Sequence, residues 1–156
     1  MRNEDLRLSA LAWSATPIRD TAAMSQANVE LIRAMYERWA RGDFPASFMD
    51  PDIVHSRTGA QTPDMEGEWR GLEAFSRAFS EYLHALSDLR IEAEEIIDLD
   101  DERVLVLSRH TAQGKLSGVP IDHELADLFT LRAGKVVRYE SYWDRAVALE
   151  TVGLAE

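Results

Sequence analysis

The chain has 156 residues, of which 46% are hydrophobic, and its formal net charge at pH 7 is −11. The length suits one domain with a real core, and the apolar content excludes a disordered chain. The negative charge argues against nucleic acid or an anionic membrane as a partner, the lack of cysteine excludes disulfides and thiolate metal sites, and no apolar run approaches the roughly 20 residues of a membrane span.

Residues 1–23 are expected to form an extension or packing arm in front of a single domain that covers residues 24–156. The segment 8–15 is mildly apolar, but Glu4 and Asp5 lie where a signal peptide would carry positive charge. A cytoplasmic location is therefore the simplest interpretation.

The first half of the domain is predicted to be mostly helical. Ser25 is a plausible N-cap for a helix over about 26–41, which carries one apolar stripe and ends at Gly42. A short helix capped by Asp43 follows through residue 48. A short strand is expected over 53–55, then a polar loop from residue 57 that contains Trp69, and then a helix from residue 72 to about 87–88.

The second half is predicted to be a run of strands over 89–98, 103–113, 119–132 and 136–143, followed by a helix over 145–151 behind the N-cap Asp144. The connections are short, and one of them is a turn at Ala133-Gly134, so an antiparallel meander is expected. Helices followed by such a sheet predict an α+β domain. If the sheet bends strongly around the helices, it leaves a cone-shaped pocket.

Asp127 is the first candidate for chemistry, because it is a lone carboxylate among the apolar residues Leu125, Leu128, Phe129 and Leu131 of its strand. On that strand its side chain shares a face with His123, Leu125, Phe129 and Leu131. A carboxylate is costly to bury there unless it is paired or used. Either it acts on a ligand, or it is bonded to a pocket arginine or tyrosine without catalysis.

Two histidines are the next candidates. His55 ends an apolar strand and has an ordinary pKa suited to a base at neutral pH, although a bond to the backbone would explain it equally well. His110 and Arg109 lie on opposite faces of their strand. We expect His110 to face the pocket and Arg109 to form ion pairs at the surface.

The pattern resembles the nuclear transport factor 2-like superfamily, and more closely its SnoaL-like polyketide cyclase and ketosteroid isomerase branches. The residues that carry the resemblance are Tyr36-Glu-Arg-Trp-Ala-Arg-Gly-Asp43, Asp52-Ile-Val-His55, Arg70-Gly-Leu-Glu-Ala-Phe75, Asp127-Leu-Phe, Gly134-Lys-Val-Val and Tyr142-Trp143. The resemblance covers about residues 24–153 and implies the cone-shaped fold with cystatin-like topology.

The resemblance also implies roles for individual residues. Asp127 matches the acid/base aspartate of the cyclases. In the isomerases it matches an aspartic acid that donates a hydrogen bond to the substrate oxygen. His55 stands where the isomerases carry an aspartate base. An ungapped count back from Gly42 places their oxyanion tyrosine at Met35, one residue before Tyr36. The resemblance further implies a homodimer paired through the sheet and chemistry without a cofactor.

Aromatic and polar side chains are expected to line the pocket, because ligand pockets are mostly apolar with few polar groups. The expected ligand-binding residues are Tyr36, Trp39, Trp69, Phe79, His123, Phe129 and Tyr142. Trp143 ends the last predicted strand and is expected to pack at a dimer contact instead.

Together these features predict a cofactor-free enzyme that removes and returns a proton on a small hydrophobic carbonyl compound, by cyclisation, isomerisation or dehydration. Asp127 would be the acid, His55 the base, and His110 or Tyr36 an auxiliary donor. The main alternative is a binding or interaction module without catalysis. Epoxide opening would need a second acid and an arginine beside Asp127, and only Arg109 is available. No metal is expected, because the histidines and acids show no ligand spacing.

Overall fold

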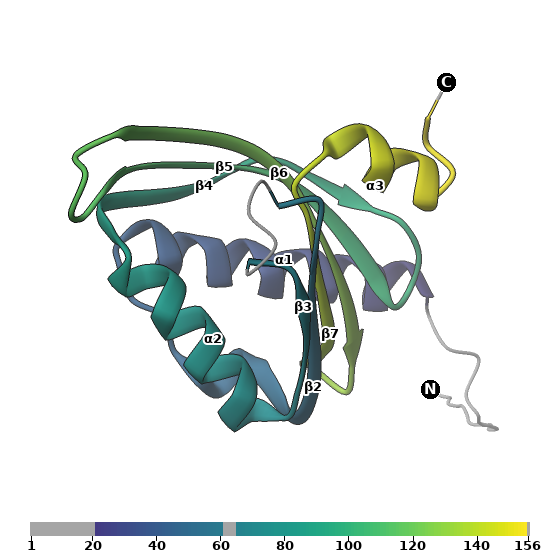
Figure 1. The fold of residues 1–156 in the computed structure, drawn as a ribbon. Coiled ribbons are helices and arrows are strands. Elements are labelled where there is room, and N and C mark those ends of the chain that lie inside the picture. The colour runs from purple at the N-terminus through teal and green to yellow at the C-terminus, as the bar shows by residue number, and fades with distance from the viewer. Residues whose placement is uncertain (1–20, 61–64, 156) are drawn as a thin grey trace, which may run out of the picture.

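The computed structural model describes residues 21–60 and 65–155, which form three helices, a single 3-10 turn and a curved six-stranded sheet (Figure 1). The helical elements are α1 (Thr21–Ala40), η1 (Ala46–Phe48), α2 (Leu72–His84) and α3 (Arg145–Thr151). The strands are β2 (Met49–Thr58), β3 (Gly67–Arg70), β4 (Leu86–Asp98), β5 (Arg103–Gly114), β6 (Pro120–Arg132) and β7 (Lys135–Tyr142). The α+β prediction is confirmed. No helix in this described part of the chain is both long and apolar enough to cross a membrane.

The sheet has the strand order β3-β2-β7-β6-β5-β4 and does not close. The strands from β4 to β7 form the predicted antiparallel meander. The expectation of a wholly antiparallel sheet is wrong at one pair, because β2 lies parallel to β7 with His55 opposite Tyr139. Strand β2 precedes the meander in the chain, yet it pairs with β7, the last strand of the meander, and runs parallel to it.

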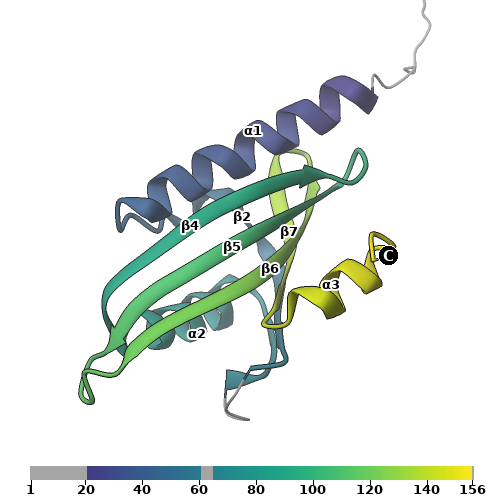
Figure 2. The same cartoon turned by 90° about the horizontal axis from the view of Figure 1, so that it is seen from above.

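Helices α1 and α2 lie inside the curve of the sheet, and α3 lies against its outer face beside β6 and β7 (Figures 1 and 2). We call the side toward α1 and α2 the inner face. The alternation of side chains along β6 places Leu125, Asp127 and Phe129 on the inner face, whereas Ala126 and Leu128 pack with Ala148 of α3 on the other. The sequence pattern therefore supplies two apolar surfaces, of which the inner one is larger.

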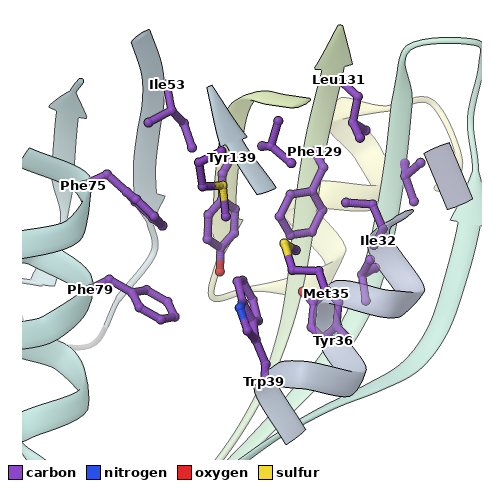
Figure 3. Packing of buried hydrophobic residues seen from close by; sticks show 14 of the residues in the cluster. Ile32, Met35, Tyr36, Trp39, Ile53, Phe75, Phe79, Phe129, Leu131 and Tyr139 are labelled. Carbon is purple, nitrogen blue, oxygen red and sulfur yellow. The ribbon is translucent and has the colours of Figure 1, made fainter. Parts of the chain in front are cut away.

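The main core lies between the inner face and the two long helices (Figure 3). Met35, Tyr36 and Trp39 reach in from α1, while Phe75 and Phe79 reach in from α2. Trp39 contacts Phe79 with ring centroids 5.4 Å apart, so the two helices meet through aromatic side chains. This packing fills one end of the curved sheet and leaves the other end open.

Several predicted boundaries are corrected. Ser25 is not an N-cap, because α1 begins at Thr21 and the Ala-rich segment before Ser25 favours helix. Helix α2 ends at His84, and β4 starts at Leu86. The predicted extension over 1–23 lies outside the described residues, except that 21–23 belong to α1.

The predicted loop from residue 57 is also corrected. Strand β2 continues to Thr58, and β3 pairs with it, so Trp69 lies on a strand directly opposite His55. The shift from loop to strand matters for the site, because it brings Arg57 onto the inner face with His55.

Candidate functional site

Asp127 is fully buried and accepts three hydroxyl hydrogen bonds. Tyr36 Oη and Ser108 Oγ donate to Oδ2 at 2.6 and 2.7 Å, and Ser141 Oγ donates to Oδ1 at 3.0 Å. Register explains the two serines: Ser141 is directly opposite Asp127 on β7, and Ser108 lies on β5, two residues from its partner Val106. The acid is thus held by one helix and two neighbouring strands.

The surroundings of Asp127 act on its pKa in two directions. Burial raises the pKa of the carboxyl, while the hydrogen bonds from Tyr36, Ser108 and Ser141 oppose the rise, and the net result is a raised pKa. Arg145 adds a smaller opposing effect from the outer face, where it donates to the carbonyls of Ser108 and Leu125. Asp127 itself has no exposed surface and does not line a described cavity, whereas Ser141, which donates to it, does.

His55 is buried with both ring nitrogens engaged. Nδ1 lies 2.9 Å from the carbonyl oxygen of Tyr139 and so carries the proton, and Nε2 accepts from Arg57 Nε at 3.2 Å. Burial, reinforced by the charge of Arg57, lowers the pKa of His55 to about 3, so the ring is neutral at physiological pH. Its lone pair is already occupied, so this geometry does not favour the base role predicted for His55.

His110 differs from His55 in having one free nitrogen. Nδ1 lies 2.7 Å from Tyr82 Oη, whereas the buried Nε2 has no hydrogen-bond partner among the described residues. The indole Nε1 of Trp143 is buried and lacks a partner there in the same way, and the two rings are 6.5 Å apart between centroids. Burial lowers the pKa of His110 to about 3, with smaller contributions from His123 and Arg57. Two unmatched polar atoms in one place indicate a ligand or an ordered water.

The residues that carry these atoms lie at two adjacent cavities. The inner cavity has a volume of about 10 Å³, room for about one water, and it is lined by His55, Arg57, Phe79, Tyr82, His110, Leu125, Tyr139, Ser141 and Trp143. The outer cavity has a volume of about 800 Å³, which suits a small organic ligand. Arg57, Tyr82 and Trp143 line both, so the two cavities adjoin, and we call the lining of the inner cavity the floor of the site.

The structure brings some of the predicted site residues together. His55, Phe79 and His110 line the inner cavity, and Trp69 and His123 line the outer one. Trp69 stacks on His55 with centroids 5.6 Å apart.

Other predicted ligand-binding residues lie elsewhere. Trp39 and Phe129 are buried in the core between α1 and the sheet, where Phe129 stacks on Tyr139, and Tyr36 is buried there with its hydroxyl on Asp127. Tyr142 is a correction: it lies on the outer face with α3 and bonds Glu140, because strand alternation turns Ser141 inward instead.

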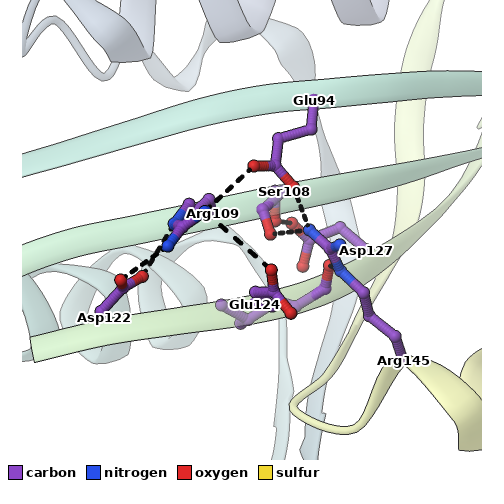
Figure 4. Close-up of polar contacts among 8 residues, drawn as sticks. Glu94, Ser108, Arg109, Asp122, Glu124, Asp127 and Arg145 are labelled. Carbon is purple, nitrogen blue, oxygen red and sulfur yellow. Dashed lines mark hydrogen bonds and ion pairs between the residues drawn. The ribbon is translucent and has the colours of Figure 1, made fainter.

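Arg109 points away from the site (Figure 4). It lies on the outer face, where it pairs with Asp122 at 2.7 Å and approaches Glu94 and Glu124 at 3.6 and 4.0 Å. The epoxide-opening alternative requires an arginine beside Asp127, and Arg109 does not meet that requirement. Within the described ranges, no group of three or more histidine or acidic side chains is arranged to hold a metal ion.

The sequence reasoning missed four site residues: Arg57, Tyr82, Ser108 and Ser141. Ser108 and Ser141 could have been found, since each lies on the strand face that alternation assigns to the inside. Arg57 is two residues beyond His55, but it was placed in a loop.

Comparisons with known proteins agree with this architecture. A family model described as SnoaL-like domain matches residues 32–139. No curated protein matches the chain. An NTF2-like protein of unknown function from Burkholderia pseudomallei superposes with a TM-score of 0.67 at 19% identity, covering 81% of this chain and 97% of that one.

Two further solved structures are similar. A protein described as a SnoaL-like polyketide cyclase from Jannaschia has a TM-score of 0.67 at 19% identity, over 88% of this chain and 99% of that one. TerC, co-crystallised with polyporic acid, has a TM-score of 0.65 at 23% identity, over 81% of this chain and 98% of that one. At these identities the likeness establishes the fold.

Proposed function

This chain belongs to the SnoaL-like domain family, and from that premise we propose that it is a cofactor-independent enzyme that moves a proton on a small hydrophobic carbonyl compound. The observation that carries the proposal is the pair of buried, unpartnered nitrogens, His110 Nε2 and Trp143 Nε1, at the floor of a ligand-sized cavity. Cyclisation, isomerisation and dehydration all begin with such a proton transfer. The co-crystallisation of TerC with polyporic acid supports small-molecule binding by this fold.

In the proposed scheme His110 is the proton acceptor. When Tyr82 Oη accepts a hydrogen bond from Nδ1–H, the lone pair on Nε2 is free to take a proton from the carbon next to the ligand carbonyl. The same proton is then returned to the product from Nε2. The low pKa of His110 makes it a weak base in the free protein, and the negative charge that forms on the ligand raises that pKa during the transfer.

Trp143 and Arg57 supply the complementary charge stabilisation. The indole N–H of Trp143 is the donor for the carbonyl oxygen, and the guanidinium of Arg57 lies at the same floor. Donors fixed in a water-poor site stabilise an oxyanion without rearranging. Asp127 acts through Ser141, so in this proposal it is a positioning residue and not the acid that contacts the ligand.

A deuterium-exchange assay tests the proposal. Ligands that co-purify are first identified by mass spectrometry, and 2-tetralone serves as the probe ketone in heavy water, with no metal or cofactor added. The protein should accelerate exchange beside the carbonyl, and His110→Gln should lower that rate by about 10²- to 10⁴-fold. His84→Gln is the matched control, because His84 is exposed on α2.

The alternative is a binding module without catalysis. It predicts that the ketone or the co-purified ligand binds while exchange stays at the buffer rate. That result would rule out the proton-transfer role of His110. The homodimer also remains a proposal, which sedimentation analysis tests directly.

A further inference from the structure

Arg57 carries a positive charge that no acid neutralises. Its side chain is largely buried at the end of β2, and none of the ion pairs among the described residues includes it. The acid that most affects its pKa is Glu81, which lies at the wall of the outer cavity. Burial lowers the pKa of the guanidinium, as expected of a cation removed from water without a partner.

The contacts of Arg57 orient its side chain, but they are made with neutral groups and so do not neutralise its charge. Nε donates to His55 Nε2, and one Nη donates to the carbonyl of Ala78, each at 3.2 Å. The guanidinium also lies 4.8 Å from the centre of the Trp69 ring and 5.6 Å from that of Tyr82. A guanidinium has five N–H donors, so three remain for another partner. Buried arginines are almost always paired, and Arg57 lines both cavities.

The same floor offers a further donor and contains no acid. Trp143 Nε1–H has no hydrogen-bond partner among the described residues and is a second donor at this floor. None of the residues that line the inner cavity is acidic. Of the two acids at the outer cavity, Asp122 is paired with Arg109 and Glu81 is exposed. The floor is therefore positive in a chain whose net charge is −11.

We propose that this floor binds an anionic oxygen, from a carboxylate or an ionised enol or phenol, and that the apolar remainder of the ligand fills the outer cavity. Arg57 would hold the anion through its free N–H fork, which matches the planar shape of a carboxylate. Trp69 and Ala78 give the outer cavity an apolar wall for the remainder. This inference rests on the proposed function in placing the ligand in the same cavity.

A binding comparison on the wild-type protein tests the inference. The probes are naphthalene-2-carboxylate and its neutral isostere naphthalene-2-carboxamide, measured by calorimetry at neutral pH. The carboxylate should bind at least about tenfold more tightly, which corresponds to one well-placed charge contact. Equal binding, or tighter binding of the amide, would exclude a carboxylate as the anion, and together with an unchanged pKa of the bound nitrophenol described below it would overturn the inference. The comparison needs no variant, so it decides the matter even if Arg57 variants fold poorly.

Variants then assign the preference to Arg57. Arg57→Gln should abolish it, and Arg57→Lys should retain part of it, because the charge remains while the fork is lost. Arg70→Gln is the matched control, since it removes the same charge from an exposed side chain that pairs with Glu68. A preference that survives Arg57→Gln would show that Arg57 is not the anion site.

A second probe separates the two sources of the anion. A nitrophenol whose ionised form is coloured should show a lowered pKa when bound, if the floor stabilises a phenolate. A lowered pKa without a carboxylate preference supports an enol or phenol ligand, and a carboxylate preference with an unchanged pKa supports a carboxylic acid. The absence of both effects would overturn the inference. Because these readouts measure binding alone, they are independent of the exchange assay that tests His110.

Discussion

Tyr36 and Asp127 are 91 positions apart in the chain, and their side chains meet at 2.6 Å in the interior. The contact joins α1 to β6, an inner strand of the meander, and satisfies a buried carboxyl. Burial also raises the pKa of the Tyr36 hydroxyl, with the charge of Asp127 adding to the effect, so the phenol stays protonated and keeps donating. This pair is a buried polar link between α1 and the sheet.

A double-mutant cycle on Tyr36→Phe and Asp127→Asn should give a coupling energy of about 1.5–3 kcal/mol in urea unfolding, because the bond is short, buried and made to a carboxyl group. The control cycle is Arg38 and Asp43, which are also 2.6 Å apart but 41% and 50% exposed. The control should give at most about 0.5–1 kcal/mol. Equal coupling energies in both cycles would mean that burial does not strengthen the Tyr36–Asp127 hydrogen bond.

The two buried histidines should make stability depend on pH. Their pKa values are lowered to about 3 in the folded chain, whereas an unfolded histidine titrates near 6.5. Between these values the unfolded state binds more protons, so the free energy of unfolding falls as the pH falls, by about 1.4 kcal/mol per pH unit for each histidine. The raised pKa of Asp127 acts in the opposite direction, since the folded state protonates first there.

Urea unfolding at several values between about pH 4 and pH 7 measures this slope. His110→Gln should reduce the slope by about 1.4 kcal/mol per pH unit, because one of the two neutral buried rings is gone. His84→Gln, on the exposed face of α2, should leave it unchanged. An unchanged slope in His110→Gln would show that His110 is already protonated or solvated in the folded state.

Trp143 and Tyr82 should respond differently to loss of their polar atom. Trp143→Phe removes a buried N–H that has no partner in the described structure, so relief of about 1–3 kcal/mol offsets the lost packing and the net change should stay within about 1 kcal/mol. Tyr82→Phe leaves His110 Nδ1 without its partner and should cost about 1–3 kcal/mol. Unfolding by urea ranks the two variants, and the reverse order would mean that Trp143 is bonded in solution.

The turn between β6 and β7 should tolerate, and gain from, one substitution. Ala133 and Gly134 have φ values of 52° and 75°, the two positive angles of a type I′ hairpin turn. A left-handed backbone costs alanine about 1–2 kcal/mol, whereas asparagine adopts it readily. Ala133→Asn should therefore raise the free energy of unfolding by about 0.5–1 kcal/mol, measured by thermal unfolding, and Gly134→Ala should lower it. A loss of stability in Ala133→Asn would exclude this source of strain.

Much of the fold follows from local patterns in the sequence. Alternation along 103–113 separates His110 from Arg109, and the structure places them on the inner and outer faces. The helices and the four meander strands were predicted in order, since their apolar periods are long and regular. The parallel pairing of β2 with β7 was not predicted, because it joins segments more than 80 residues apart and leaves no local signal.

The site was predicted less completely, for a related reason. The polar composition after His55 indicated a loop, but β3 pairs with that segment and carries the strand through Arg57. Tyr142 was predicted in the pocket and Trp143 at a dimer contact, yet alternation on β7 turns Tyr142 toward α3, and Trp143 lines the cavity. Alternation places Asp127 on the inner face, but it does not tell whether the acid itself borders the cavity. In the structure Ser141, which donates to Asp127, lines the inner cavity, and Asp127 does not.

The parallel pairing of β2 and β7 has a consequence for the order of folding. His55 Nδ1 bonds the carbonyl of Tyr139, 84 positions later, and this contact exists only once the last strand has formed. During synthesis, β2 and β3 therefore leave the ribosome before β7, the other strand that pairs with β2. The long chain segment between β2 and β7 must close into a loop before β2 and β3 are protected. The floor of the cavity, which takes residues from both ends of this loop, is expected to be the last part of the molecule to assemble, and truncation within β7 should leave the meander without its binding site.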